Sequence, residues 1–484
     1  MKKIMMVAGV LVCALPLFAK IKLGTPFADG MVLQRGMKVP VWGTAETGKM
    51  VTVSFAGAEL SAVAGADGKW MVKLPKMEAS KESRTMVVIG DGRVEIRDVL
   101  VGEVWFASGQ SNMECPIWGD HTRYRDGKGG LMTTMTYLPY VRFAKNGKRW
   151  TIDPTRANVP GWKRFEPASF TGYTLSAVAF YYARELYLAL DVPIGIVDAS
   201  WGGTNIDAWT PRCGYEGCDK SIQMVADHPV KRDWKAETDK IWTIDGARQQ
   251  PTVLWNAMVD SWTPMAMRGF IWYQGCSNVG NAPGYEAGFQ AMIEDWRAQW
   301  KSPEMPFYFV QLANFLKPSD LQPESQWALL REAQAKALAL KGTGMAVNID
   351  LGDEVNIHPG TKRELARRLS RIALNQTYGQ KKVNFTAPIY QSYRVEGNEM
   401  RIQFSEPTGY EPFEQDENLP GFIVAGADRK WHVAKARTEG NEVIVSCPEV
   451  KTPLAARYGW ADNPTCTLKT KSNLHVAPFR TDNW

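Results

Sequence analysis

The sequence predicts an α/β domain with a largely parallel sheet, flanked by a β domain on each side. Between about Val104 and Tyr378, apolar runs typical of buried strands alternate with stretches of helical length, which indicates βαβ units. Outside this segment, short runs of alternating apolar and polar residues lie between Gly, Asp and Pro turns, as in all-β domains. The 484 residues leave room for about two to four domains, so three units fit the length.

Each element of the central domain follows from its own run of residues. Five apolar runs predict strands, at residues 104–107, 194–197, 270–273, 307–310 and 345–349. Four longer stretches predict helices, at residues 176–190, 285–300, 325–340 and 361–378. We therefore divide the chain into a signal peptide (1–19), an N-terminal β domain (20–102), the α/β domain (103–382) and a C-terminal β domain (383–484).

The first 19 residues have the pattern of a secretory signal peptide. Lys2 and Lys3 precede an apolar run at residues 4–18, and Ala19 supplies a small residue at the expected cleavage site. The run is shorter than the roughly 20 residues needed to span a bilayer, and no second run of that length follows. We therefore expect a periplasmic or secreted protein without membrane insertion.

Composition narrows the classes of partner. Lys and Arg number 57 against 51 Asp and Glu, and no run of five basic residues occurs, so no nucleic-acid partner is expected. The 19 Trp residues favour a carbohydrate ligand, because aromatic rings stack on the apolar faces of sugars.

Cysteine spacing predicts disulfides and no metal site. Besides Cys13 in the signal peptide the chain has six cysteines, and an even number in an oxidising compartment permits up to three disulfides. Proximity in the sequence favours Cys213 with Cys218 and Cys447 with Cys466. No cysteine pair has zinc-site spacing and histidines are few, so no metal is expected.

The residues that follow the predicted strands are the first candidates for a site, because ligands of open α/β sheets bind at the carboxyl ends of strands. Ser111 follows the first central strand, and Gly109 permits a tight turn before it. This placement suits an exposed nucleophile, and equally an ordinary polar turn or helix cap.

Two more loops at the same predicted edge supply hydrogen-bond donors. Gly202 and Gly203 follow the strand at 194–197, and paired glycines let backbone N–H groups approach a ligand closely, as an oxyanion hole requires. Gln274 and Asn278 follow the strand at 270–273, and their amides are either further donors or turn residues.

One histidine has the position of a general base. His358 follows the strand at 345–349 after a short acidic loop and precedes a predicted helix, so it can face Ser111. A lone histidine is more often structural, but serine, paired glycines, amides and histidine at one sheet edge favour nucleophilic catalysis. The other four histidines are His121, His228, His432 and His475.

These loops resemble those of the sialate O-acetylesterase family of SGNH hydrolases. The resemblance rests on the segments at 104–113, 202–204, 272–278 and 357–362. It extends to the segments at 31–35, 40–43, 66–70, 98–105, 306–308 and 478–482, and so covers nearly the whole chain after the signal peptide. It implies an SGNH three-layer α/β/α domain between β domains, and removal of acetyl groups from sugars without a metal or organic cofactor.

Carried over by position, the resemblance implies that Ser111 is the nucleophile and His358 the base. A hydrogen-bonded imidazole takes the serine proton as the oxygen attacks the acetyl carbonyl. The oxyanion would be held by the Ser111 N–H, by one glycine N–H and by one side-chain amide. The candidate glycines are Gly202 and Gly203, and the candidate amides are those of Gln274 and Asn278. From these we predict an oxyanion hole of Gly203, Gln274 and Asn278.

Two departures from the family pattern leave open which group orients His358. The family commonly has Glu where this chain has Cys276, and it often has Asp two residues before the histidine, where this chain has Asn356. We predict Asp353 as the third catalytic residue, with Glu354 as the second choice. A backbone carbonyl would instead leave a Ser–His dyad, since orientation needs only an acceptor for the ring N–H.

A third disulfide is a further hypothesis. Cys115 lies four residues past Ser111 and Cys276 lies in the amide loop, so both flank predicted catalytic loops. Intact mass before and after reduction and alkylation would contradict the pairing if both thiols were free.

The leading functional hypothesis is removal of 9-O-acetyl groups from free or glycan-linked sialic acid. An acetylxylan or pectin deacetylase would share the serine and histidine and differ in its substrate loops. A non-catalytic carbohydrate-binding protein on the same scaffold is the third hypothesis, motivated by Cys276 and Asn356. A sialate carboxylate favours a nearby arginine. The candidates are Arg123, Arg125, Arg142 and Arg149, none of which the sequence places in the pocket.

Overall fold

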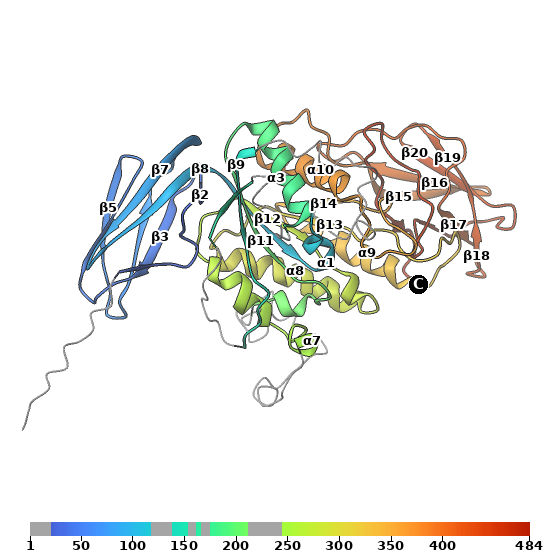
Figure 1. Ribbon diagram of the computed structural model, residues 1–484. Coiled ribbons are helices and arrows are strands. Elements are labelled where there is room, and N and C mark those ends of the chain that lie inside the picture. Colours follow the sequence, from blue (N-terminus) through green and yellow to red (C-terminus); the bar gives the residue numbers. More distant parts are fainter. Residues whose placement is uncertain (1–20, 118–137, 153–160, 166–174, 212–243) are drawn as a thin grey trace, which may run out of the picture.

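The computed structural model consists of three units in a row (Figure 1). It describes residues 21–117, 138–152, 161–165, 175–211 and 244–484. β-Strands of the N-terminal region lie at one end, a sheet with helices on both sides lies in the middle, and a second β region lies at the other end. This arrangement confirms the predicted fold class.

The central sheet is mainly parallel, in the order β10-β9-β11-β8-β12-β13-β14. Within this order β10 and β9 pair antiparallel and the other neighbours pair parallel. Each of the five predicted strands overlaps one of these. The strands are β8 (Arg93–Gly109), β9 (Leu138–Lys145), β10 (Lys163–Phe165), β11 (Ile194–Ser200), β12 (Gly269–Tyr273), β13 (Phe307–Val310) and β14 (Thr343–Ala346).

Helices cover both faces of this sheet, with α3 and α10 together on one side and α8 with α9 on the other (Figure 1). Ser176 and Ser325 begin α3 and α9, because each serine hydroxyl accepts an N–H from the first turn of its helix. The helices are α1 (Ser111–Glu114), α3 (Ala177–Leu190), α7 (Ile244–Ala247), α8 (Ala282–Gln299), α9 (Gln326–Lys336) and α10 (Lys362–Ile372). Short 3₁₀ or π turns are η2 (Asp207–Trp209), η3 (Trp255–Val259), η4 (Asp260–Trp262), η5 (Cys276–Asn278), η6 (Ala337–Ala339) and η7 (Ala373–Thr377).

Strand β8 belongs to both the N-terminal β region and the central sheet. It pairs with β7 and β2 as far as Gly102, and with β11 from Glu103 onward. The predicted boundary after residue 102 falls inside this strand, and the domain limits stay predictions. The N-terminal strands are β1 (Lys22–Leu23), β2 (Val32–Gln34), β3 (Val39–Thr44), β4 (Met50–Phe55), β5 (Ala58–Val63), β6 (Lys69–Leu74) and β7 (Ser80–Ile89).

A buried carboxylate joins the N-terminal region to the central sheet. Glu103 lies fully buried in β8, and Arg35 and Arg268 donate to its two oxygens over 2.6 Å and 2.7 Å. Gln34 adds a hydrogen bond of 3.0 Å. A buried charge is tolerated only when it is paired in this way, so this network holds β2, β8 and the start of β12 in one arrangement.

The C-terminal β region forms two four-stranded sheets around a hydrophobic core of its own, which includes Met400, Phe422 and Val443. Its strands are β15 (Ile389–Glu396), β16 (Glu399–Ser405), β17 (Phe422–Ala425), β18 (Trp431–Val433), β19 (Lys435–Glu439), β20 (Glu442–Ser446), β21 (Ala455–Tyr458) and β22 (Phe479–Arg480). Among the described residues, no helix is long and apolar enough to cross a membrane.

The predicted pairing of Cys447 with Cys466 is wrong. Both thiols are free, and Cys447 donates a hydrogen bond to Glu449 over 2.9 Å. Burial raises the pKa of the Cys466 thiol to about 12. The other local pair, Cys213 with Cys218, lies outside the described residues.

Candidate active site

Three strands of the central sheet end at the same level, and a loop follows each of them. Gly109 at the end of β8 pairs with Ser200 at the end of β11 and with Tyr273 at the end of β12. Because these strands are parallel neighbours, the loops that follow begin side by side. Ser111, Gly203 and Gln274 belong to these three loops, as the sequence predicted.

Gly109 makes the turn that presents Ser111. Its φ is +139°, and a Cβ at this position would lie 2.2 Å from the carbonyl oxygen of Tyr273, so only glycine fits. Ser111 is the first residue of α1 and is half-buried. Its N–H lies in the first turn of a helix, where amides have no intrahelical acceptor and can serve a ligand.

The paired glycines lie against the serine. A methyl group at Gly202 would lie 3.1 Å from Ser111 Cβ, so the backbone of this turn touches the predicted nucleophile. The Gly202 N–H donates to Glu114 Oε2, which leaves the Gly203 N–H as the glycine donor predicted for the oxyanion hole. Gly203 has a φ of +69°, which favours glycine at this turn.

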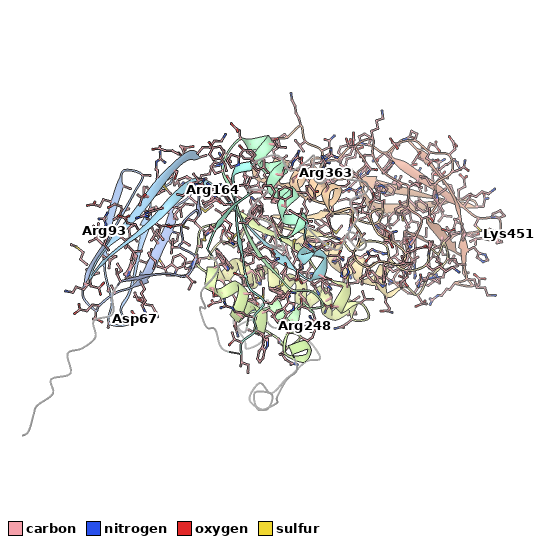
Figure 2. The ribbon with its side chains drawn as sticks, viewed as in Figure 1. Asp67, Arg93, Arg164, Arg248, Arg363 and Lys451 are labelled. Atoms are coloured by element: carbon pink, nitrogen blue, oxygen red, sulfur yellow. The ribbon has the colours of Figure 1, made fainter. Side chains whose placement is uncertain are left out.

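Two residues that sequence reasoning missed hold the glycine turn from outside. Arg248, labelled in Figure 2, follows α7 and donates to the Gly202 carbonyl over 2.9 Å. Gln249 donates to the Gly203 carbonyl and accepts the N–H of Asn205 over 2.9 Å. Neither residue follows a predicted strand, so the sequence carried no signal for them. Glu114 did have a signal, because it lies three residues after Ser111 and so within one helical turn of it.

The two predicted amides have different surroundings. The Gln274 amide nitrogen donates both of its hydrogens, to the Thr204 carbonyl over 3.1 Å and to Asn278 Oδ1 over 2.7 Å. Asn278 Oδ1 also accepts the N–H of Ile206 over 3.1 Å, so the nitrogen end of this amide points away from both bonds. Gln274 therefore uses both amide hydrogens inside the protein and holds Asn278 in place, which leaves Asn278 as the predicted amide donor. The oxyanion hole itself stays a prediction.

The loop that carries His358 is joined to the serine helix. Asn112 donates a hydrogen bond of 3.0 Å to the carbonyl of Ile357, the residue before His358. The His358 N–H donates to Asn356 Oδ1 over 2.9 Å, so the residue that replaces the family's Asp holds the backbone of the predicted base. The structure thus brings all four predicted loops together.

Asp353 lies at an exposed turn of the same loop. Its Oδ1 accepts the N–H groups of Val355 over 2.9 Å and of Asn356 over 2.8 Å. These two bonds fix the shape of the turn that leads to His358. The role of Asp353 as the acid that orients the imidazole stays a prediction, and the second choice, Glu354, is exposed.

The proposed disulfide between Cys115 and Cys276 is wrong as well, because both thiols are free. Burial raises the pKa of Cys115 to about 11 and that of Cys276 to about 12. Both thiols are therefore neutral near pH 7 and act as small apolar groups behind the site.

Of the arginines suggested for a sialate carboxylate, the structure describes Arg142 and Arg149. Arg142 is buried and donates to Asp98 and to the Pro139 carbonyl, and Arg149 is exposed. Arg123 and Arg125 lie outside the described residues. The same is true of His121 and His228. Within the described ranges, no three His, Cys, Asp or Glu side chains gather as metal ligands would.

This geometry suits acyl transfer to serine. A serine at a glycine turn, N–H donors around it and a histidine loop joined to its helix are the parts that ester hydrolysis through a serine requires. The fold and the site define a serine-dependent carboxylic ester hydrolase of the α/β class.

Comparisons with known proteins identify the family. The model of the family described as carbohydrate esterase, sialic acid-specific acetylesterase, matches residues 101–375. The chain belongs to this family, and its reaction class is the removal of O-acetyl groups from carbohydrates.

Similar proteins cover nearly the whole chain. A carbohydrate acetylesterase from Xanthomonas citri has a crystal structure similar to this one, with a TM-score of 0.82 and 35% identity over 96% of this chain and all of that one. The sialate O-acetylesterases of Mus musculus and Homo sapiens are 28% and 27% identical to it, over 93% of this chain and 92% and 90% of theirs.

Proposed function

We propose that this esterase removes the 9-O-acetyl group of sialic acid through an acetyl-serine intermediate on Ser111. The observation that carries the proposal is the junction of the catalytic loops, where Gly202 lies against Ser111 and Asn112 binds the His358 loop. The sialate substrate is supported by the two mammalian relatives, which are sialate O-acetylesterases.

In the first half of the reaction, His358 takes the hydroxyl proton of Ser111 as Oγ forms a bond to the acetyl carbon. The carbonyl electrons move onto oxygen, and N–H groups of Ser111, Gly203 and Asn278 hold the resulting oxyanion. Loss of one such donor typically lowers the rate about 10²- to 10³-fold. The oxyanion collapses, the bond to the sugar oxygen breaks, and that oxygen takes the proton from His358.

In the second half, a water molecule replaces the sugar. His358 takes a proton from the water as its oxygen attacks the acetyl carbon of acetyl-Ser111. A second oxyanion forms in the same site and collapses with loss of the serine oxygen, which regains its proton from His358. Acetate leaves, and the free enzyme is restored.

The test is acetate release from 9-O-acetylated sialic acid and, in parallel, from acetylated xylan and acetylated pectin. Wild-type protein should release acetate from the sialate, and Ser111→Ala should lower the rate at least about 10³-fold. Release only from xylan or pectin would keep the mechanism and overturn the substrate. Activity that survives in Ser111→Ala would overturn the assignment of the nucleophile.

We also propose that the chain is exported to the periplasm or secreted. Lys2, Lys3 and the apolar run at residues 4–18 support this proposal. The N-terminal sequence of the protein isolated from the producing cells tests it: a chain that begins at Lys20 supports cleavage after Ala19, and one that begins at Met1 contradicts it.

A further inference from the structure

Lys362 is a buried amine behind the proposed catalytic residues. It is the first residue of α10, four residues after His358, and only 4% of it is exposed. Burial lowers the pKa of its ammonium to about 8. Among the described residues no carboxylate pairs with it, and the face of the Tyr273 ring lies 5.6 Å from Nζ. A buried cation without a carboxylate destabilises a fold, so its presence here calls for another reason.

The hydrogen bonds of Lys362 lead directly to the catalytic loops. Its Nζ donates to Asn112 Oδ1 over 2.5 Å, and the other end of the same amide donates to the Ile357 carbonyl over 3.0 Å. Asn112 is the neighbour of Ser111, and Ile357 is the neighbour of His358. One side-chain amide therefore connects the predicted nucleophile with the predicted base, and the lysine holds one end of it.

The chemistry of lysine fixes which way this amide points. An ammonium has only donors, so it accepts no hydrogen bond and can face only the oxygen of the amide. A flipped Asn112 would set its NH₂ group against the ammonium and its oxygen against the Ile357 carbonyl. Both contacts would be repulsive, so the bond to Ile357 exists only in the orientation that Lys362 enforces.

We propose that Lys362 is a positioning residue for ester hydrolysis: by orienting the Asn112 amide, it fixes the His358 loop against the helix that carries Ser111. This inference rests on the proposed roles of Ser111 and His358. It assigns the lysine no contact with the substrate. Its effect is on the distance between nucleophile and base, and misplacement of reacting groups by about 1 Å can lower a rate about 10²-fold.

The substitution Lys362→Met distinguishes a positioning role of this lysine from a purely structural one, because the two roles predict opposite effects on activity. Lys362→Met keeps a long unbranched side chain, one atom shorter than lysine, and removes the buried charge, which is often neutral or stabilising. If the lysine only fills space, this variant keeps its activity. If it positions Asn112, the variant folds as well as wild type and loses turnover.

The experiment measures kcat and KM with 4-nitrophenyl acetate, and the rate at which diisopropyl fluorophosphate labels Ser111, followed by intact mass. For Lys362→Met we expect kcat and the labelling rate to fall about 10- to 100-fold, with KM within about twofold and an unchanged or higher melting temperature. Lys362→Arg keeps a donor and should recover part of the loss. Unchanged kcat in a folded Lys362→Met protein would overturn the proposal.

A double-mutant cycle shows whether the lysine acts through Asn112. Asn112→Leu keeps the approximate size of the side chain and removes both its bond to Lys362 and its bond to Ile357, so it tests the link even if Lys362→Met does not fold. We expect it to lower kcat to a similar degree, and the double variant to be no slower than the slower single variant. Losses that multiply, or wild-type turnover in Asn112→Leu, would overturn the proposal.

Two control variants separate this proposal from a general effect of lost buried hydrogen bonds and from a failure of the proposed function. Tyr308→Phe removes a partly buried hydrogen bond of 2.6 Å to Thr377, elsewhere in the same domain, and should leave kcat unchanged. Ser111→Ala tests the proposed function. If Ser111→Ala is inactive and Lys362→Met is fully active, only the positioning role fails. If Ser111→Ala is active, the assignment of the nucleophile fails.

Discussion

The backbone N–H of Gly202 donates a hydrogen bond of 2.6 Å to the Glu114 carboxylate. This bond joins the glycine turn after β11 to the helix that begins with Ser111. The other oxygen of Glu114 pairs with Lys148 over 2.5 Å, and Arg248 holds the carbonyl of the same glycine. The turn is therefore fixed on both sides before a substrate arrives, as electrostatic preorganisation requires.

The first prediction concerns Glu114. Glu114→Ala removes the acceptor of the Gly202 N–H and should lower kcat about 10-fold, because the turn loses the bond that holds it beside Ser111. Glu114→Gln keeps an oxygen acceptor and should stay within about threefold of wild type. Lys341→Ala is the control, since it removes an ion pair with Glu304 that is exposed on both sides and contributes little. Full activity in Glu114→Ala, measured with 4-nitrophenyl acetate, would show that the bond has no part in turnover.

The second prediction concerns the space at Gly202. A methyl group there would lie 3.1 Å from both Ser111 Cβ and Glu114 Oε2, closer than carbon atoms normally approach. Gly202→Ala should therefore displace the serine and lower kcat about 10²-fold, with a melting temperature within a few degrees of wild type. Gly147→Ala is the matched control, because its methyl group would meet only Arg149 Nε, at 3.9 Å. Equal activity in the two variants contradicts the close approach.

The loops that meet at the carboxyl ends of the strands were predictable, because buried parallel strands have a clear pattern in the sequence. Strands buried on both faces are continuous apolar runs, and the polar residues after them must meet at one edge. This argument placed Ser111, Gly203 and His358 in neighbouring loops.

The individual hydrogen bonds were not predictable, because they depend on orientation and on distant parts of the chain. Gln274 was predicted as an oxyanion donor, but the direction of an amide is set by Thr204 and Asn278, which the sequence does not place. Arg248 reaches the Gly202 carbonyl from 46 residues away. The free thiols of Cys447 and Cys466 show the same limit, since nearness in sequence does not place two sulfur atoms in bonding geometry.

The third prediction uses the buried carboxyl of Asp295 in α8. Burial, with a smaller effect of Glu294, raises its pKa to about 7, and no described group hydrogen-bonds to its Oδ2. The folded state therefore keeps a proton between about pH 4 and 7 that the unfolded state has lost, so this group makes stability fall as the pH rises through that window.

Asp295→Asn removes this ionisation. At pH 8 it should raise the free energy of unfolding by about 2 to 4 kcal/mol, and the gain should shrink as the pH approaches 4. Urea unfolding at several pH values measures it. Glu304→Gln, at an exposed ion pair, should change stability by less than about 0.5 kcal/mol. A gain that is the same at every pH would mean that ionisation is not its cause.

The fourth prediction concerns His475, which connects the C-terminal β region to the loop that follows β14 and leads to the predicted base. Its Nε2 lies 3.3 Å from Asp350, whose two oxygens already accept hydrogen bonds of 2.6 Å and 2.7 Å from Arg368. Burial lowers the pKa of His475 to about 4, with Arg368 and Lys469 also opposing its protonation and Asp350 favouring it. The imidazole is therefore neutral in the folded protein near neutral pH.

The sign of the pH effect follows from the two states. The unfolded chain protonates His475 near pH 6.5 and the folded chain only near pH 4, so stability falls as the pH drops from about 6.5 to 4. At pH 5 this difference in pKa lowers the free energy of unfolding by about 2 kcal/mol relative to neutral pH. His475→Gln cannot be protonated, so it should lose less stability than wild type between pH 7 and pH 5. Parallel urea-unfolding curves for the two proteins over this range would contradict the prediction. A smaller loss in the variant would mean that protonation of His475 contributes to the loss of stability in acid.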